Sequence, residues 1–132
     1  MQLPDEWPDR EYSRFVAADG LTWHVQQRGA GPVVLLLHGT GASSHSWIPL
    51  ARLLESRYTL VMPDLPGQGF TEFASPAQSS LPGMARTLAA LLRQLEQMPA
   101  LIVGHSAGAA VAATLCLQGA CNPAAVVSVN GA

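Results

Sequence analysis

Residues 101–108 read Leu-Ile-Val-Gly-His-Ser-Ala-Gly and join a predicted strand to a predicted helix. The first three residues suit a buried strand, and Ala107–Leu117 is an apolar run of helical length. A sharp strand-to-helix reversal forces Ser106 into a strained backbone conformation and holds its hydroxyl clear of the sheet. Gly104 and Gly108 lie where a Cβ atom would collide across the turn. We predict a nucleophile elbow with Ser106 as the catalytic residue; the alternative is a small-residue turn without chemistry.

A second stretch, His38-Gly39-Thr40-Gly41, follows the continuous apolar run Val33–Leu37. Such runs suit a strand of a parallel sheet, and the carboxyl ends of parallel strands meet at one edge, where chemistry is placed. Acyl transfer needs two backbone donors for the developing oxyanion. We predict that the N–H groups of Thr40 and Ala107 form this oxyanion hole. His38, Gly39 and Gly41 are assigned to the structure of the loop, with His38 as a hydrogen-bonding organiser rather than the general base.

The same loop is also a near-match to a dinucleotide-binding fingerprint. The spacing Gly39-x-Gly41-x-x-Ser44 has the first two glycines, but a serine stands where the third would allow close helix–strand packing. The elbow explains both loops together, whereas the dinucleotide interpretation explains one of them.

A third loop, Asp64-Leu65-Pro66-Gly67-Gln68-Gly69, follows the predicted strand Tyr58–Met62. An aspartate at the end of a strand commonly accepts hydrogen bonds from the loop that follows. We therefore expect Asp64 to have a structural role, with a catalytic role as the alternative.

Strand-like and helix-like segments alternate along the chain, which predicts an α/β fold with a mostly parallel sheet and helices on both faces. The dipeptide Asp19-Gly20 predicts a β-hairpin between Ser13–Ala18 and Leu21–Gln27. We expect one domain over residues 1–132, with residues 1–12 as an N-terminal extension. The remaining predicted elements are a helix from Trp47 to near Arg57, a helix behind the N-cap candidates Ser79 and Ser80 that carries Leu81–Leu95, and a strand at Ala125–Val129.

Composition excludes several classes of function. The chain has 132 residues, 48% of them hydrophobic and 12% charged, with a net charge of −2 and no lysine. There is no basic face for nucleic acid and no lysine for a P-loop or a Schiff base. No residues show metal-ligand spacing, and no cofactor is expected. The predicted partner is a small-molecule substrate.

The distribution of charge is uneven, because no charged residue follows Glu96. The longest uninterrupted apolar segment, Ala107–Leu117, is too short to span a membrane. We expect a buried strand–helix–strand whose covering layers, further strands and lid are missing from this chain.

No secretory signal is visible, and Cys116 and Cys121 fit reduced thiols, so we expect a cytoplasmic protein.

Together the His-Gly-Thr-Gly, Asp-x-Pro-Gly-x-Gly and Gly-His-Ser-Ala-Gly segments resemble the α/β-hydrolase superfamily, of which this chain would be the N-terminal part. Further segments resemble the magnesium-chelatase accessory proteins of bacteriochlorophyll biosynthesis, a pathway of photosynthesis. Gln68 stands where relatives often carry histidine. The narrower likeness is carried by Trp7–Arg10, Ser13–Val16, Gly20–Gln26, His38–Trp47, Asp64–Glu72, Ser80–Ala85 and Ser128–Ala132.

In this superfamily the catalytic acid and histidine follow the serine in chain order. Here all four histidines and all nine carboxylates precede Ser106, so the chain lacks the usual base. We expect these residues alone to be inactive as an esterase and prone to aggregate along the last strand.

Three functions remain open for the intact parent. The first is a serine hydrolase with Ser106 as nucleophile, acting in bacteriochlorophyll synthesis on a porphyrin or its ester. The second is a non-catalytic module that binds porphyrin or magnesium chelatase. The third is a generic esterase, C–C hydrolase or cofactor-free haloperoxidase.

Overall fold

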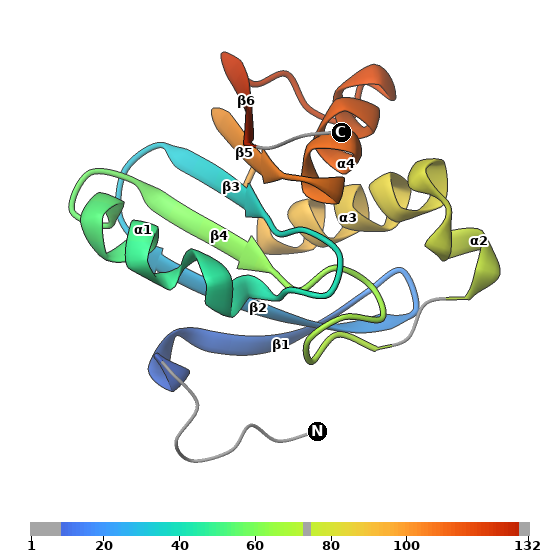
Figure 1. Ribbon diagram of the computed structural model, residues 1–132, viewed down its shortest axis with the longest axis horizontal. Coiled ribbons are helices and arrows are strands. Elements are labelled where there is room, and N and C mark those ends of the chain that lie inside the picture. The colour runs from blue at the N-terminus through green and yellow to red at the C-terminus, as the bar shows by residue number, and fades with distance from the viewer. Residues whose placement is uncertain (1–8, 73–74, 130–132) are drawn as a thin grey trace.

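A computed structural model describes residues 9–72 and 75–129 and shows one six-stranded sheet (Figure 1). The strand order is β1-β2-β4-β3-β5-β6, with β1–β2 and β2–β4 antiparallel and the other three neighbouring pairs parallel. The predicted hairpin followed by a parallel sheet is therefore confirmed. The strands are β1 (Ser13–Ala18), β2 (Leu21–Gly29), β3 (Val33–Leu37), β4 (Thr59–Pro63), β5 (Leu101–His105) and β6 (Ala125–Val129).

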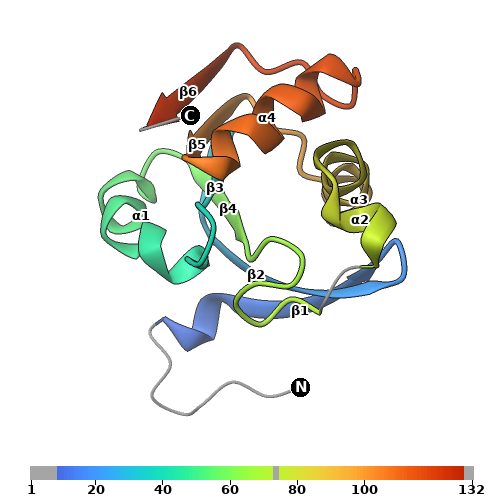
Figure 2. The ribbon, with the colours of Figure 1, turned by 45° about the vertical axis from the view of Figure 1, so that its right-hand side comes forward.

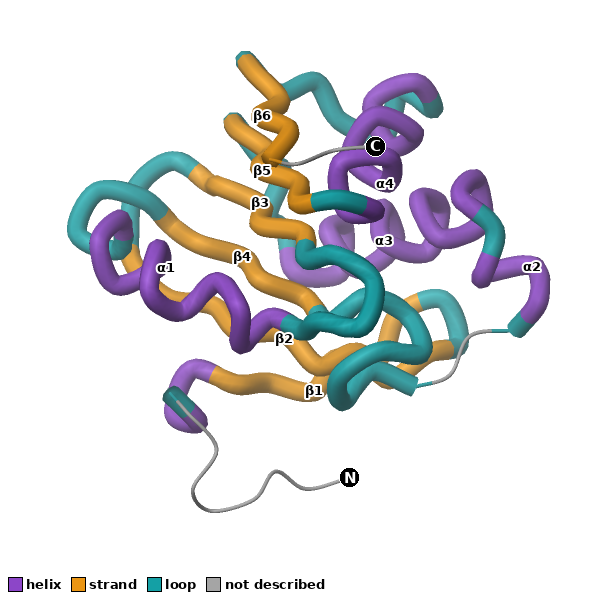
Figure 3. The backbone as a smooth tube through the Cα atoms, viewed as in Figure 1, coloured by secondary structure: helices purple, strands orange, loops and turns teal. Residues whose placement is uncertain are grey.

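Helices cover both faces of the sheet. Figure 2 shows α1 on one side and α3 with α4 on the other, and Figure 3 shows the same layers along the backbone. Residues 1–8 of the predicted N-terminal extension, residues 73–74, and residues 130–132 at the end of the last resemblance segment lie outside the described residues. The helices are α1 (Ile48–Leu54), α2 (Pro76–Ser79), α3 (Leu81–Leu95) and α4 (Ala107–Leu117), with 3-10 turns at Arg10–Tyr12 and Ser44–Trp47.

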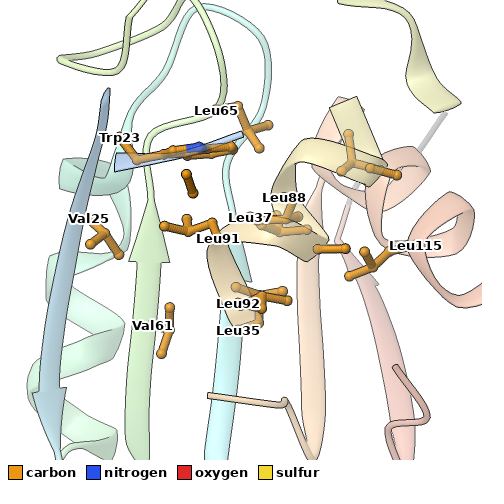
Figure 4. Close-up of a cluster of buried hydrophobic side chains, with 14 of the residues drawn as sticks. Trp23, Val25, Leu35, Leu37, Val61, Leu65, Leu88, Leu91, Leu92 and Leu115 are labelled. Carbon is orange, nitrogen blue, oxygen red and sulfur yellow. The ribbon is translucent and has the colours of Figure 1, made fainter. Parts of the chain in front are cut away.

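The alternation of side chains along β3 divides the core between the two layers. Leu35 and Leu37 face the larger cluster, which contains the apolar stripe of α3 and part of α4 (Figure 4). Val34 and Leu36 face the smaller cluster beneath α1. Both faces of β3 are therefore buried, which is why its sequence is a continuous apolar run rather than an alternating one.

Several predicted boundaries differ from the structure: β2 extends to Gly29 rather than Gln27, and β4 spans Thr59–Pro63 rather than Tyr58–Met62. The helix predicted to run from Trp47 to near Arg57 is a 3-10 turn followed by α1, which ends at Leu54. Beyond Leu54 the chain continues in turns, with the N–H groups of Arg57 and Tyr58 both donating to the carbonyl of Leu54. The backbones of Gly29 and Gly31 pack closely against residues 55–58. The short helix α2 was not predicted, and β5 runs two residues beyond the predicted strand, to His105.

The last strand, β6, forms one edge of the sheet, and all five of its residues are exposed. Val126, Val127 and Val129 are among the exposed large hydrophobic side chains. Within residues 9–72 and 75–129, no helix has the length and apolar character needed to cross a bilayer.

Candidate active site

Ser106 lies at the reversal between β5 and α4, with a backbone φ of 55° and ψ of −119°. These angles lie outside the regions that L-residues ordinarily occupy, so the conformation is strained. The amide of Ser106 donates a hydrogen bond to the carbonyl of Val129 at 3.0 Å, which ties the turn to β6. The side chain is half-buried and not part of the packed interior. This is the backbone geometry that the elbow prediction requires.

The two glycines of the elbow allow backbone segments to approach closely. A Cβ atom on Gly104 would lie 2.6 Å from backbone atoms of Ala109 in the first turn of α4. A Cβ atom on Gly108 would lie 2.3 Å from the carbonyl oxygen of Leu37 at the end of β3. Only glycine therefore lets α4 start directly beside β3 and β5.

The loop that follows β3 packs directly against the elbow. A Cβ atom on Gly39 would lie 3.2 Å from the Cβ of Ser106, so the two loops are in contact. Gly41 has a φ of 80°, a conformation that favours glycine. Among the described residues, no acceptor is hydrogen-bonded to the backbone N–H of Thr40 or of Ala107. The two amides of the predicted oxyanion hole therefore belong to loops that are in contact.

His38 is fully buried and hydrogen-bonded through both ring nitrogens. Its Nδ1 donates to the carbonyl of Gly39 at 2.7 Å, and its Nε2 accepts from the N–H of Leu65 at 2.8 Å. Burial lowers the pKa of His38 below its ordinary value, despite the opposing effects of the Gly39 bond and the charge of Asp64. The imidazole is therefore neutral and joins two loops, which leaves no free nitrogen to take a proton from Ser106.

Asp64 is also fully buried and accepts hydrogen bonds from three groups. These are the Nδ1 of His24 at 2.7 Å, the N–H of Ser44 at 2.6 Å and the N–H of Phe70 at 2.9 Å. Burial alone would raise the pKa of Asp64, but these hydrogen bonds and the charge interaction with His24 hold it below the ordinary value. The carboxylate connects a strand and two loops rather than pointing at Ser106.

Two residues of this region had no role assigned from the sequence. The side-chain oxygen of Gln68 accepts a hydrogen bond from the N–H of Gly41 at 2.9 Å and so fastens the loop beside the elbow. His24 is fully buried and binds Asp64. The signal for His24 was a titratable residue between Trp23 and Val25, which are both fully buried in β2.

A small cavity of about 190 Å³ lies beside the elbow and is lined by Ser46, Trp47, His105 and Val129. Among the described residues, no histidine or carboxylate is hydrogen-bonded to the hydroxyl of Ser106. The same part of the chain holds no group of three histidine, cysteine or acidic residues arranged around a metal ion. Among the described residues, the half-buried Ser106 therefore has no histidine or carboxylate partner.

Comparison with known proteins identifies similar chains. The family described as alpha/beta hydrolase fold matches residues 32–131. The magnesium-chelatase 30 kDa subunit of Rhodobacter capsulatus is 40% identical over 118 residues, which cover 88% of this chain and 42% of that protein. The pimeloyl-[acyl-carrier protein] methyl ester esterase of Aeromonas hydrophila subsp. hydrophila is 37% identical over 71% of this chain and 35% of its own length.

Among solved structures, an epoxide hydrolase from Vigna radiata superposes with a TM-score of 0.80 at 34% identity. The match covers 88% of this chain and 38% of that one. The chain thus spans less than half the length of these relatives. The resemblance predicted from the three loop motifs is confirmed at the level of the superfamily.

Proposed function

The chain belongs to the alpha/beta hydrolase fold family, and from this premise we propose that the intact protein is a serine hydrolase-fold protein of bacteriochlorophyll biosynthesis. Ser106 is its nucleophile, and the N–H groups of Thr40 and Ala107 form its oxyanion hole. The pathway rests on the 40% identity to the magnesium-chelatase 30 kDa subunit, and the fold by itself does not establish a reaction.

One observation carries the proposal: Ser106 has a strained backbone at a strand–helix reversal and lies against the glycine loop that follows β3. The φ of 55° at Ser106 and the contact with Gly39 combine two features that a purely structural turn does not need. Strain of this kind costs about 1–3 kcal/mol and persists where the surrounding structure holds it, typically at functional sites.

The reaction requires a base that these residues do not supply. We propose that the intact protein contributes a carboxylate and a histidine from the part of the fold that its relatives have beyond this chain. The histidine accepts the proton of Ser106 as the hydroxyl attacks a carbonyl carbon, and later returns it to the leaving group. The two amides stabilise the oxyanion, and loss of one such donor typically costs about 100- to 1000-fold in rate.

The test is labelling of the intact protein with a fluorophosphonate probe. We expect one covalent adduct, located at Ser106 by peptide mass spectrometry, and its loss in the Ser106→Ala variant. A Ser46→Ala variant, which changes a neighbouring cavity residue, is the matched control and retains labelling. An intact protein that stays unlabelled, or a label that survives in Ser106→Ala, removes Ser106 from this role.

A second candidate is a non-catalytic module that binds porphyrin or magnesium chelatase. Its support is the similarity to the magnesium-chelatase 30 kDa subunit, together with the lack of a base beside Ser106 in the part of the chain that the structure describes. Protoporphyrin binding that is unchanged in Ser106→Ala, with no labelling and no turnover, distinguishes this candidate from the first.

We also propose a cytoplasmic location. Cys116 and Cys121 are free thiols, as expected in a reducing compartment.

A further inference from the structure

Three side chains that do not include Ser106 form a continuous row of hydrogen bonds. The hydroxyl of Ser13 lies 2.9 Å from the Nε2 of His24, and the Nδ1 of His24 lies 2.7 Å from a carboxylate oxygen of Asp64. Ser13 is the first residue of β1, His24 lies in β2, and Asp64 follows β4. The pairing of β1 with β2 and of β2 with β4 brings the three residues together.

The hydrogen-bonding roles in this row follow from the carboxylate. Hydrogen bonds hold the pKa of Asp64 below its ordinary value, so Asp64 is ionised near neutral pH and can only accept. The Nδ1 of His24 therefore carries a proton and donates it to Asp64. When the ring is neutral, its Nε2 is the acceptor, and the Ser13 hydroxyl donates to it across 2.9 Å. A hydroxyl bonded to a base that a third group orients is the arrangement of an activated nucleophile.

The surroundings hold the imidazole in this orientation. The rings of Phe15 and Phe70 lie 5.3 Å and 5.6 Å from the ring of His24, centroid to centroid, and both His24 and Asp64 are fully buried. A side-chain N–H of Gln26 lies 3.3 Å from the Ser13 oxygen and donates to it, which leaves the hydroxyl proton directed at His24. Ser13 itself is half-buried at the start of an edge strand, so part of the residue is in contact with solvent.

We propose that Ser13 is a second nucleophilic serine, activated by His24 and Asp64, which accepts an acyl group from small activated acyl donors. The Ser13 oxygen forms a bond to the acyl carbon, and the bond from that carbon to the leaving group breaks. The hydroxyl proton passes to the Nε2 of His24 and then to the departing group. The products are acylated Ser13 and the protonated leaving group, with one acyl group transferred per chain.

The experiment uses the 132-residue chain and p-nitrophenyl acetate. Release of p-nitrophenol is followed by absorbance, and acetylation of each serine is quantified by peptide mass spectrometry, with fragment ions separating Ser13 from Tyr12. Ser79 is the internal reference because it is exposed and its hydroxyl donates to the backbone carbonyl of Ser75 at 3.0 Å. A positioned base contributes about 100-fold or more, so we expect Ser13 to be acetylated about 100-fold faster than Ser79.

Variants show whether fast acetylation of Ser13 depends on His24 or only on the exposure of Ser13 to solvent. Ser13→Ala removes the early release of p-nitrophenol, whereas Ser79→Ala leaves it unchanged. His24→Gln lowers acetylation of Ser13 to the level of Ser79, with circular dichroism reporting whether the variant folds. Acetylation of Ser13 no faster than that of Ser79 in the unmodified chain overturns the proposal, and this comparison holds even where His24→Gln does not fold. Because acetylation is read residue by residue, the result is independent of Ser106.

Discussion

At the scale of single residues, His38 shows how burial sets the chemistry of a titratable group. Both nitrogens are engaged by loop backbone, one as a donor to Gly39 and one as an acceptor from Leu65. Protonation would place a second hydrogen on Nε2, opposite the N–H of Leu65, and would break that bond. The neutral ring is therefore part of what holds the two loops together.

This environment predicts a pH dependence of stability. The pKa of His38 in the folded chain lies below the ordinary value of 6.5, so the unfolded chain binds a proton first as pH falls. The stabilising contribution is complete above about pH 6.5 and is lost as pH falls below it, by at most about 1.4 kcal/mol per pH unit. We expect the free energy of unfolding to fall less between pH 7 and pH 5 in His38→Gln than in the unmodified chain.

Urea unfolding at the two pH values measures this difference. His45 serves as the matched control, because it lies in the exposed 3-10 turn before α1. A His45→Gln variant keeps the slope of the unmodified chain. Equal slopes for His38→Gln and the unmodified chain would contradict the assignment of His38 as a buried neutral imidazole.

At the scale of elements, α3 illustrates how local signals place a helix. Ser80 is its N-cap and accepts a hydrogen bond from the N–H of Gly83 at 3.1 Å. Pro82 lies in the first turn, where its missing N–H removes no helical hydrogen bond. Glu96 ends the helix in a left-handed conformation with a φ of 57°. The apolar stripe between these ends packs against the sheet.

Removing the cap has a predictable cost. We expect Ser80→Ala to lower the free energy of unfolding by about 1 kcal/mol, because the Gly83 amide loses its side-chain acceptor. Thermal unfolding followed by circular dichroism measures the change. Ser79→Ala, which alters the preceding exposed residue, is expected to change stability by less than about 0.5 kcal/mol. Similar losses in the two variants would show that the cap is not the source.

At the scale of the whole molecule, β6 leaves one edge of the parallel sheet open. The strand pairs with β5 on one side, and its valines are exposed, with Val127 at 43%. An exposed apolar edge presents unpaired backbone groups to another chain and favours association edge to edge. The 132-residue chain is therefore expected to self-associate through β6.

A charge on this edge should reduce that association. We expect Val127→Lys to raise the monomeric fraction in sedimentation velocity experiments, because an edge lysine opposes pairing between strands. Leu53→Lys is the control: Leu53 is 77% exposed but lies on α1, away from the edge. If both variants raise the monomeric fraction equally, general surface hydrophobicity rather than β6 drives association.

Much of the fold could be predicted because its signals are local. Five elements have the predicted boundaries: the strands β1, β3 and β6 and the helices α3 and α4. Their signals, which are apolar periodicity, caps and turn residues, lie within each segment. The end of α1 differs because the residues after Leu54 form hydrogen-bonded turns up to Tyr58 rather than regular helix. The short helix α2 has a local signal, the capping box of Ser75 and Gln78 with Pro76 in the first turn, but its four residues carry no apolar periodicity, and it was not predicted.

For the candidate site, the sequence by itself determined which loops meet at the carboxyl edge of the sheet and which serine occupies the strand–helix turn. The spacing of residues within the turn is sufficient for this prediction. A glycine two residues before the serine and another two residues after it constrain the backbone of the turn directly. Only the tertiary structure decided that Gln68 binds Gly41 and that Asp64 joins His24 and Ser13 in one row. Those contacts connect residues from separate strands and loops, and their geometry depends on how the whole sheet twists and packs.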